Sequence, residues 1–207
     1  MTKGVAYPVW SRNGGTSIMA KNLTGNDQRF TQLINRELRI HYPPSFLGRH
    51  LRTVVVCKDL THGGESVGGV SVTSLQAIYL NMIQEELDQA SEVLFVQALH
   101  HEIAHMFVPS INEWFFRDWR ALNSNTFTYR NERDPGLEDA AGDTAESPTG
   151  AFVNDYSTTG IREDFCEVYA LLMSRHLATF DDNRVGPALS KKIEMVKALL
   201  DEWGLMY

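Results

Sequence analysis

Residues 101–105 read His-Glu-Ile-Ala-His, and residues of these types at this spacing can hold a metal ion. In a helix, His101 and His105 lie one turn apart on the same face, where two neutral imidazoles can bind one ion. Glu102 lies beside that face and can accept a proton from a water whose pKa a zinc ion lowers to about 7. The motif therefore indicates hydrolysis by a metal-activated water.

The surrounding residues favour a metal site over two surface histidines. The segment 91–108 is apolar almost all round and Pro109 follows it, so we predict a buried helix there. Two histidines and a glutamate inside a core need partners, and a metal ion supplies them. On a helix, H-E-x-x-H is the arrangement of zinc peptidases.

A hydrolytic zinc site has three protein ligands and one open position, so one ligand must come from outside the motif. A metzincin would have its third histidine six residues after His105, but residue 111 is isoleucine, which excludes that class. The downstream side chains that could bind the metal are Glu163, Asp164, Glu167 and His176.

The segment 156–173, YSTTGIREDFCEVYALLM, resembles the second half of the lethal-factor-type gluzincins. This group of zinc metallopeptidases includes the catalytic domain of anthrax lethal factor, the Pro-Pro endopeptidases and the Mlc titration factor A peptidases. In them a helix that opens Glu-x-Phe-x-Glu supplies the zinc-binding glutamate, and a tyrosine seven residues earlier points at the site. Glu163, Phe165 and Glu167 match the helix, and Tyr156 matches the tyrosine.

The resemblance implies a zinc-dependent endopeptidase with one zinc ion per chain. It implies that Glu102 is the general base, that Tyr156 stabilises the transition state, and that the metal ligands are His101, His105 and Glu163. The alternative is a non-catalytic zinc-binding module that keeps the fold and acts by binding proteins.

Two further acidic residues lie on the same predicted helix as Glu163. Glu167 follows it by one turn on one face, so only one of the two need bind metal and the other can orient a ligand histidine. Asp164 replaces no ligand of the resembling group, and we expect it to be solvated or to cap the helix.

The elements that position these residues predict an α+β fold with a small, mostly antiparallel sheet packed on helices. The resemblance implies that it is zincin-like, with the active-site helix 91–108 and the glutamate helix 160–176 across a cleft. Apolar periodicity and β-branched runs predict further helices at 26–42, 112–123 and 187–203, and strands at 51–57, 70–73 and 77–80.

With 207 residues the chain suits one domain, 1–207. We expect the sheet and the H-E-x-x-H helix in 1–110 and a mainly helical subdomain in 111–207. Cys57 and Cys166 make neither a disulfide framework nor a cysteine-rich zinc site, so both are expected to be small buried side chains.

Charge and hydropathy limit the partners. The net charge is −7 and no basic cluster exceeds two adjacent residues, which disfavours nucleic acids and anionic membranes. No apolar run could cross a bilayer, and the N-terminal residues lack the apolar segment of a secretory signal. We therefore expect a cytoplasmic protein, or one exported by another route, and the oligomeric state stays open.

The expected substrate is a peptide or protein segment in extended conformation. Such a peptide can join a sheet as an added strand. We predict that it adds to the strand 77–80, which precedes the active-site helix 91–108. The glycine-rich segment 61–69 is most simply a hairpin turn, although a ligand role for His62 stays open. We expect 131–150, which is rich in acidic residues, to be a long surface loop.

Overall fold

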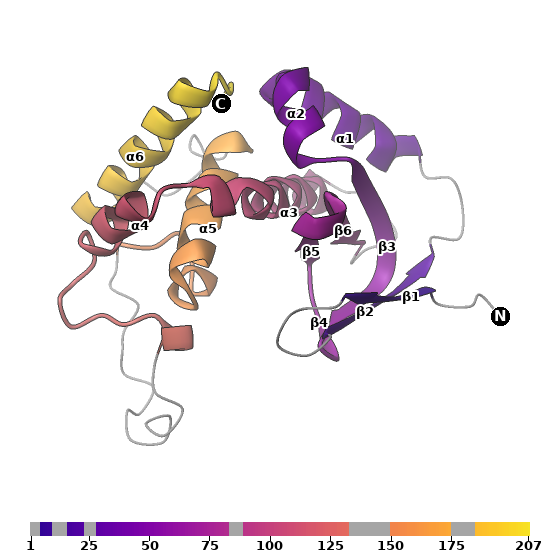
Figure 1. The fold of residues 1–207 in the computed structure, drawn as a ribbon, viewed down its shortest axis with the longest axis horizontal. Coiled ribbons are helices and arrows are strands. Elements are labelled where there is room, and N and C mark those ends of the chain that lie inside the picture. The colour runs from indigo at the N-terminus through magenta and orange to yellow at the C-terminus, as the bar shows by residue number, and fades with distance from the viewer. Residues whose placement is uncertain (1–4, 10–15, 23–27, 83–88, 133–149, 175–184) are drawn as a thin grey trace. The chain divides into compact units, whose positions relative to one another are not determined.

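The structure is a computed structural model that describes residues 5–9, 16–22, 28–82, 89–132, 150–174 and 185–207 (Figure 1). The chain divides into two compact units, residues 1–107 and 108–207. This boundary falls close to the expected division at residue 110, and a single domain across both units stays a prediction. The arrangement of helices 91–108 and 160–176 across a cleft also stays a prediction, because the two helices belong to different units.

The first unit contains a mixed sheet, and among its described strands β3 and β6 are the one parallel pair of neighbours. The strands run in the order β1-β2-β3-β6-β5, and β4 pairs with the C-terminal end of β3. Their bounds are β1 Val5–Val9, β2 Thr16–Asn22, β3 Thr53–His62, β4 Glu65–Ser66, β5 Gly69–Val72 and β6 Ala77–Asn81. The expected mostly antiparallel sheet is confirmed, and β1 and β2 are additions that the sequence did not predict.

The turn between β3 and β4 explains the glycines of the segment 61–69. His62 pairs with Glu65 across the ladder, and Gly63 and Gly64 form the turn with φ of 64° and 92°. Two central residues with positive φ match the twist of a tight hairpin, and glycine adopts them without strain. His62 is exposed at the end of this hairpin.

The prediction that a substrate strand adds to residues 77–80 is wrong. β6 lies inside the sheet, where Tyr79 pairs with Val55 of β3 on one side and with Val70 of β5 on the other. Its backbone groups are therefore already used in both directions. Among the described strands β5 pairs with β6 alone, so β5 lies at the edge of the sheet.

The described residues of the first unit also form the α-helices α1 Gln28–His41, α2 Pro44–His50 and α3 Gln89–Phe107. α1 and α3 confirm the predicted helices, although residues 26 and 27, the first of the predicted helix 26–42, lie outside the described residues. The buried face of α1 comprises Phe30, Leu33, Ile34, Glu37 and His41, so two polar residues continue an apolar stripe. The Phe30 ring lies 4.9 Å from the Phe95 ring of α3, between centroids, which packs the two helices together.

The second unit is mainly helical, with α4 Glu113–Arg120, α5 Ile161–Met173 and α6 Pro187–Trp203. The second unit also has the short 3-10 helices η2 Val108–Ser110, η3 Arg130–Glu132 and η5 Tyr156–Thr158. The 3-10 helix η1 Thr73–Leu75 lies in the first unit. α6 begins at Pro187 and ends before Gly204, in agreement with the predicted helix 187–203, and the φ of 65° at Gly204 suits a glycine C-cap. Most of the predicted acidic loop, residues 133–149, lies outside the described residues.

The α+β class expected from the sequence agrees with the mixed helices and sheet of the described residues. Both cysteines are buried, as predicted, and burial raises the pKa of Cys57 to about 11. Of the helices that the structure describes, none has the length and apolar character needed to span a membrane.

Candidate active site

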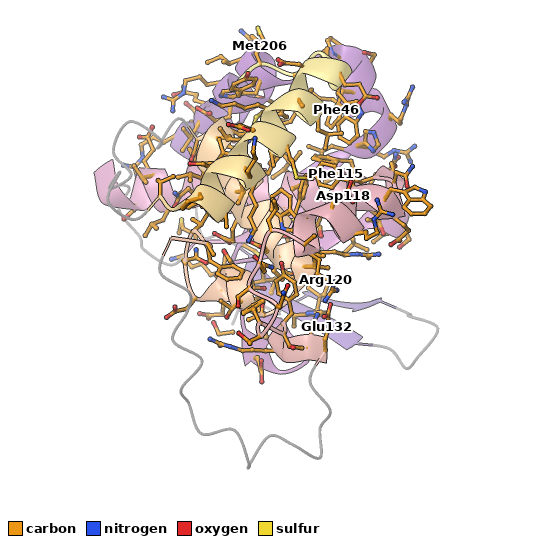
Figure 2. The ribbon with its side chains drawn as sticks, turned by 90° about the vertical axis from the view of Figure 1, so that its left-hand side faces the viewer. Phe46, Phe115, Asp118, Arg120, Glu132 and Met206 are labelled. Atoms are coloured by element: carbon orange, nitrogen blue, oxygen red, sulfur yellow. The ribbon has the colours of Figure 1, made fainter. Side chains whose placement is uncertain are left out.

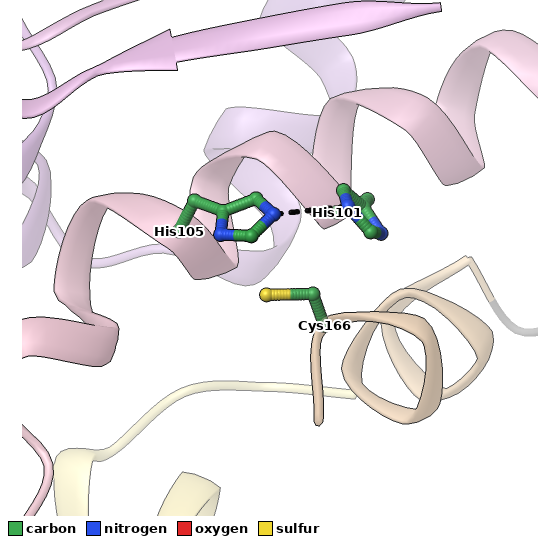
Figure 3. Close-up of side chains that lie close together, drawn as sticks. All are labelled: His101, His105 and Cys166. Carbon is green, nitrogen blue, oxygen red and sulfur yellow. Dashed lines mark hydrogen bonds between the residues drawn. The ribbon is translucent and has the colours of Figure 1, made fainter. Parts of the chain in front are cut away.

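α3 places the three polar residues of the H-E-x-x-H motif within the first unit, and Figure 3 shows the two histidines. His101 and Glu102 are buried, with 8% and 7% of their surface exposed, and His105 is half-buried. The Nε2 atoms of His101 and His105 lie 3.1 Å apart, so both rings point to the same place from successive turns. Cys166, the third side chain drawn in Figure 3, belongs to the second unit.

The two histidines suit a zinc ion. Two nitrogens that each lie about 2.0–2.1 Å from one tetrahedral zinc are separated by about 3.3 Å, and the separation here is close to that value. The unprotonated nitrogen of a neutral imidazole inside a protein core also needs a hydrogen-bond donor or a cation as partner. The donor atoms of the motif therefore fit the metal that the sequence implied.

Gly69 at the start of β5 leaves room for the Glu102 side chain. A Cβ atom at residue 69 would lie 2.6 Å from both Cγ and Oε1 of Glu102, far inside van der Waals contact. The edge strand β5 and the helix α3 therefore meet at Glu102, and a larger residue at position 69 would force the Glu102 side chain to shift.

Replacing Gly69 with alanine is expected to displace the Glu102 carboxylate and to lower kcat for peptide hydrolysis by about 10-fold to 10²-fold, because small misplacements of a catalytic group are costly. Zinc content should not change, since the three atoms nearest to the new methyl group all belong to Glu102. Gly68→Ala is the matched control, because a Cβ at residue 68 meets no atom within 4 Å. Equal activity of the two variants would contradict this role of Gly69.

In the second unit, Tyr156 and Glu163 are positioned by elements that share a hydrogen-bond network. Tyr156 opens η5 and is 53% exposed, while Glu163 is half-buried in the first turn of α5. Asn154 links the two elements, because its Oδ1 accepts from the backbone N–H of Ser157 at 3.0 Å and its Nδ2 donates to Glu167 at 2.7 Å. Glu167 thus helps to hold η5 against α5.

The beginning of α5 is also fixed by η3. The backbone N–H of Asn131 donates to Thr159 at 3.0 Å, just before the N-cap residue Gly160. Arg120 of α4 forms a bidentate ion pair with the Glu132 carboxylate of η3, in which Nη2 lies 2.6 Å from Oε1 (Figure 2). These contacts fix the first turn of α5, where Glu163 lies.

Asp164 is fully buried, so the prediction that it is solvated or caps the helix is wrong. Its Oδ2 accepts hydrogen bonds from Lys192 Nζ at 2.7 Å, Tyr129 Oη at 2.7 Å and Trp119 Nε1 at 2.8 Å. Burial raises the pKa of Asp164 and lowers that of Lys192, and their mutual attraction opposes both changes. Asp164 therefore anchors α5 by these three hydrogen bonds. Because the side chain is fully buried among them, we exclude it as a zinc ligand.

The structure brings His101, Glu102 and His105 together in one unit and places Tyr156 and Glu163 on adjoining elements of the other. That these two groups meet at one zinc ion stays a prediction. His176, another ligand candidate, lies outside the described residues. Sequence reasoning missed Gly69, which a glycine within a strand could have signalled, and Asn154, for which the sequence gives no signal.

No protein-family model, no curated protein and no solved structure matches this chain. The resemblance to the lethal-factor-type gluzincins therefore stays a hypothesis based on two motifs. The support for the candidate site comes from the geometry of its own side chains.

Proposed function

We propose that this protein is a zinc-dependent endopeptidase of gluzincin type, with a zincin-like fold. The observation that carries the proposal is the H-E-x-x-H motif, in which the Nε2 atoms of His101 and His105 lie 3.1 Å apart and Glu102 is buried. The residues that would hold the zinc ion are His101, His105 and Glu163.

In the proposed mechanism the metal ion and two side chains each have a separate role. A bound zinc ion would supply a Lewis acid that polarises the scissile carbonyl and makes water more acidic. Glu102 accepts the proton of the attacking water and then gives it to the leaving amine, so the peptide bond breaks without a net proton change. Tyr156 donates a hydrogen bond to the oxygen that becomes negative in the transition state.

The edge strand β5 is the best surface on which to present an extended substrate. A peptide that adds to β5 forms backbone hydrogen bonds that do not depend on its sequence. Because Gly69 of β5 lies against Glu102, such a peptide would pass beside the general base. Unfolded segments should therefore be cleaved in preference to intact helices.

Zinc binding tests the ligand set. His101→Ala, His105→Ala and Glu163→Ala are each expected to lose one equivalent of zinc relative to the parent chain, because each removes a ligand of a three-ligand site. Metal analysis after dialysis measures this, with His62→Ala on the exposed hairpin as the control. Full zinc content in Glu163→Ala would exclude Glu163 as a ligand and leave Glu167 as the carboxylate candidate of α5.

Tyr156→Phe is expected to lower kcat by roughly 10²-fold, or about 3 kcal/mol, with little change in KM, because one hydrogen-bond donor to the transition state is lost. Steady-state kinetics on a peptide substrate measure both constants. Tyr207→Phe, which alters another exposed tyrosine, is the control. A change confined to KM would make Tyr156 a substrate-binding residue.

A further inference from the structure

A second group of side chains that could bind a metal ion lies on α1 and α3, within the first unit. Glu37, His41 and His100 each offer one ligand atom, and the three atoms lie within 4.8 Å of one another. All three side chains are buried, with exposed fractions of 7%, 2% and 0%. His100 precedes His101 in α3, so the two histidines point in different directions around the helix.

The spacing of these atoms fits a metal ion better than it fits hydrogen bonds. Nε2 of His41 and Nε2 of His100 each lie 3.4 Å from Oε2 of Glu37. A good N–H···O bond is about 2.9 Å long, so both contacts are long. Two ligands of one tetrahedral zinc ion are separated by about 3.3 Å, which is close to both distances.

The surrounding contacts orient the donor atoms as in a metal site. Tyr42 Oη lies 2.7 Å from Nδ1 of His100, so the other ring nitrogen, Nε2, faces Glu37. Ligand histidines usually have such a partner on the nitrogen that does not bind metal. Arg36 donates to Oε1 of Glu37 at 2.9 Å, which leaves Oε2 to face the histidines.

We propose that Glu37, His41 and His100 bind a divalent transition-metal ion, with zinc as the best match, and that this ion ties α1 to α3. The donor set of two imidazoles and one carboxylate suits zinc. The site lies apart from the H-E-x-x-H ligands and has no part in the proposed hydrolysis. Its role is to hold α1 against the helix that carries the catalytic motif.

The test uses the full chain with both His101 and His105 replaced by alanine, so that the candidate active site cannot bind the probe ion. After dialysis against Zn²⁺ and removal of free metal, this double variant is expected to retain one zinc per chain and to show a higher Tm than its metal-free form. A double variant that binds no zinc would overturn this proposal, and the proposed peptidase function would stand.

Adding Glu37→Gln to the double variant is expected to abolish both the bound zinc and the rise in Tm. Glu92→Gln is the matched control, because Glu92 also accepts a hydrogen bond from Arg36, at 3.0 Å, but lies outside the cluster. Zinc retained after Glu37→Gln would overturn the proposed ligands. If that variant does not fold, Co²⁺ in the double variant decides, because its visible spectrum distinguishes protein nitrogen ligands from water alone.

Discussion

Replacing Glu102 with glutamine is expected to lower kcat for peptide hydrolysis by about 10³-fold or more, since general acid–base catalysis contributes up to about 10⁴-fold. The amide cannot accept the proton of the attacking water. Because glutamine has nearly the same shape, it still fits against Gly69, and the two histidines keep their places. Kinetics on a peptide substrate, together with metal analysis, separate the loss of the base from a loss of zinc.

Glu92→Gln is the control for Glu102→Gln, because it makes the same change on the same helix at a more exposed residue. It is expected to keep the parent activity. If Glu102→Gln retained activity within about tenfold of the parent, another group would be the base and the proposed mechanism would be wrong.

Asp164→Ala is expected to destabilise the protein by about 3–5 kcal/mol, because it leaves the charge of Lys192 buried without its partner. Tyr129 and Trp119 lose the same acceptor oxygen. Urea denaturation monitored by tryptophan fluorescence measures the free energy of unfolding. Partial recovery in Asp164→Ala combined with Lys192→Met would assign the loss to the buried charge.

Glu194→Gln is the control for Asp164→Ala, because it removes a carboxylate that pairs with Lys191 on the surface. Surface pairs contribute about 1 kcal/mol or less, so its effect should be small. A loss no greater than this for Asp164→Ala would contradict the anchoring role of Asp164.

Local patterns were enough to predict most helices and some strands. The stripe of α6, bounded by Pro187 and Gly204, combines apolar periodicity with a start signal and a stop signal, and the structure agrees at both ends. The β-branched run in 51–57 identified β3, which continues to His62. In these segments the physical cause of the structure lies within a few neighbouring residues.

Features that depend on distant residues could not be predicted in this way. β6 has the same strand signal whether it lies at the edge or inside the sheet, because only the pairing with β3 and β5 decides. The burial of Asp164 depends on Lys192, which lies on another helix. Glu37 looks like a surface residue until His100 of α3 is placed beside it.

The candidate site also combines features that depend on neighbouring residues with features that depend on distant ones. The spacing of His101 and His105 on one helix face follows from helix geometry alone, and the structure has both rings together. The closeness of Gly69 to Glu102 joins a strand to a helix, so a glycine in a strand could signal a close approach but not that Glu102 is the side chain that lies there.

Cleavage of an unfolded polypeptide before and after removal of the metal tests the proposed function most directly. The zinc-loaded protein is expected to generate new N-termini, detected by mass spectrometry, and to lose this activity when metal analysis shows that a chelator has removed the zinc. Added Zn²⁺ should restore cleavage to the parent chain but not to Glu102→Gln. If the fully zinc-loaded protein cleaved no unfolded substrate, the proposed peptidase function would be wrong and a non-catalytic zinc-binding module would be favoured. If the metal-free chain cleaved the substrate, the proposed zinc mechanism would be wrong.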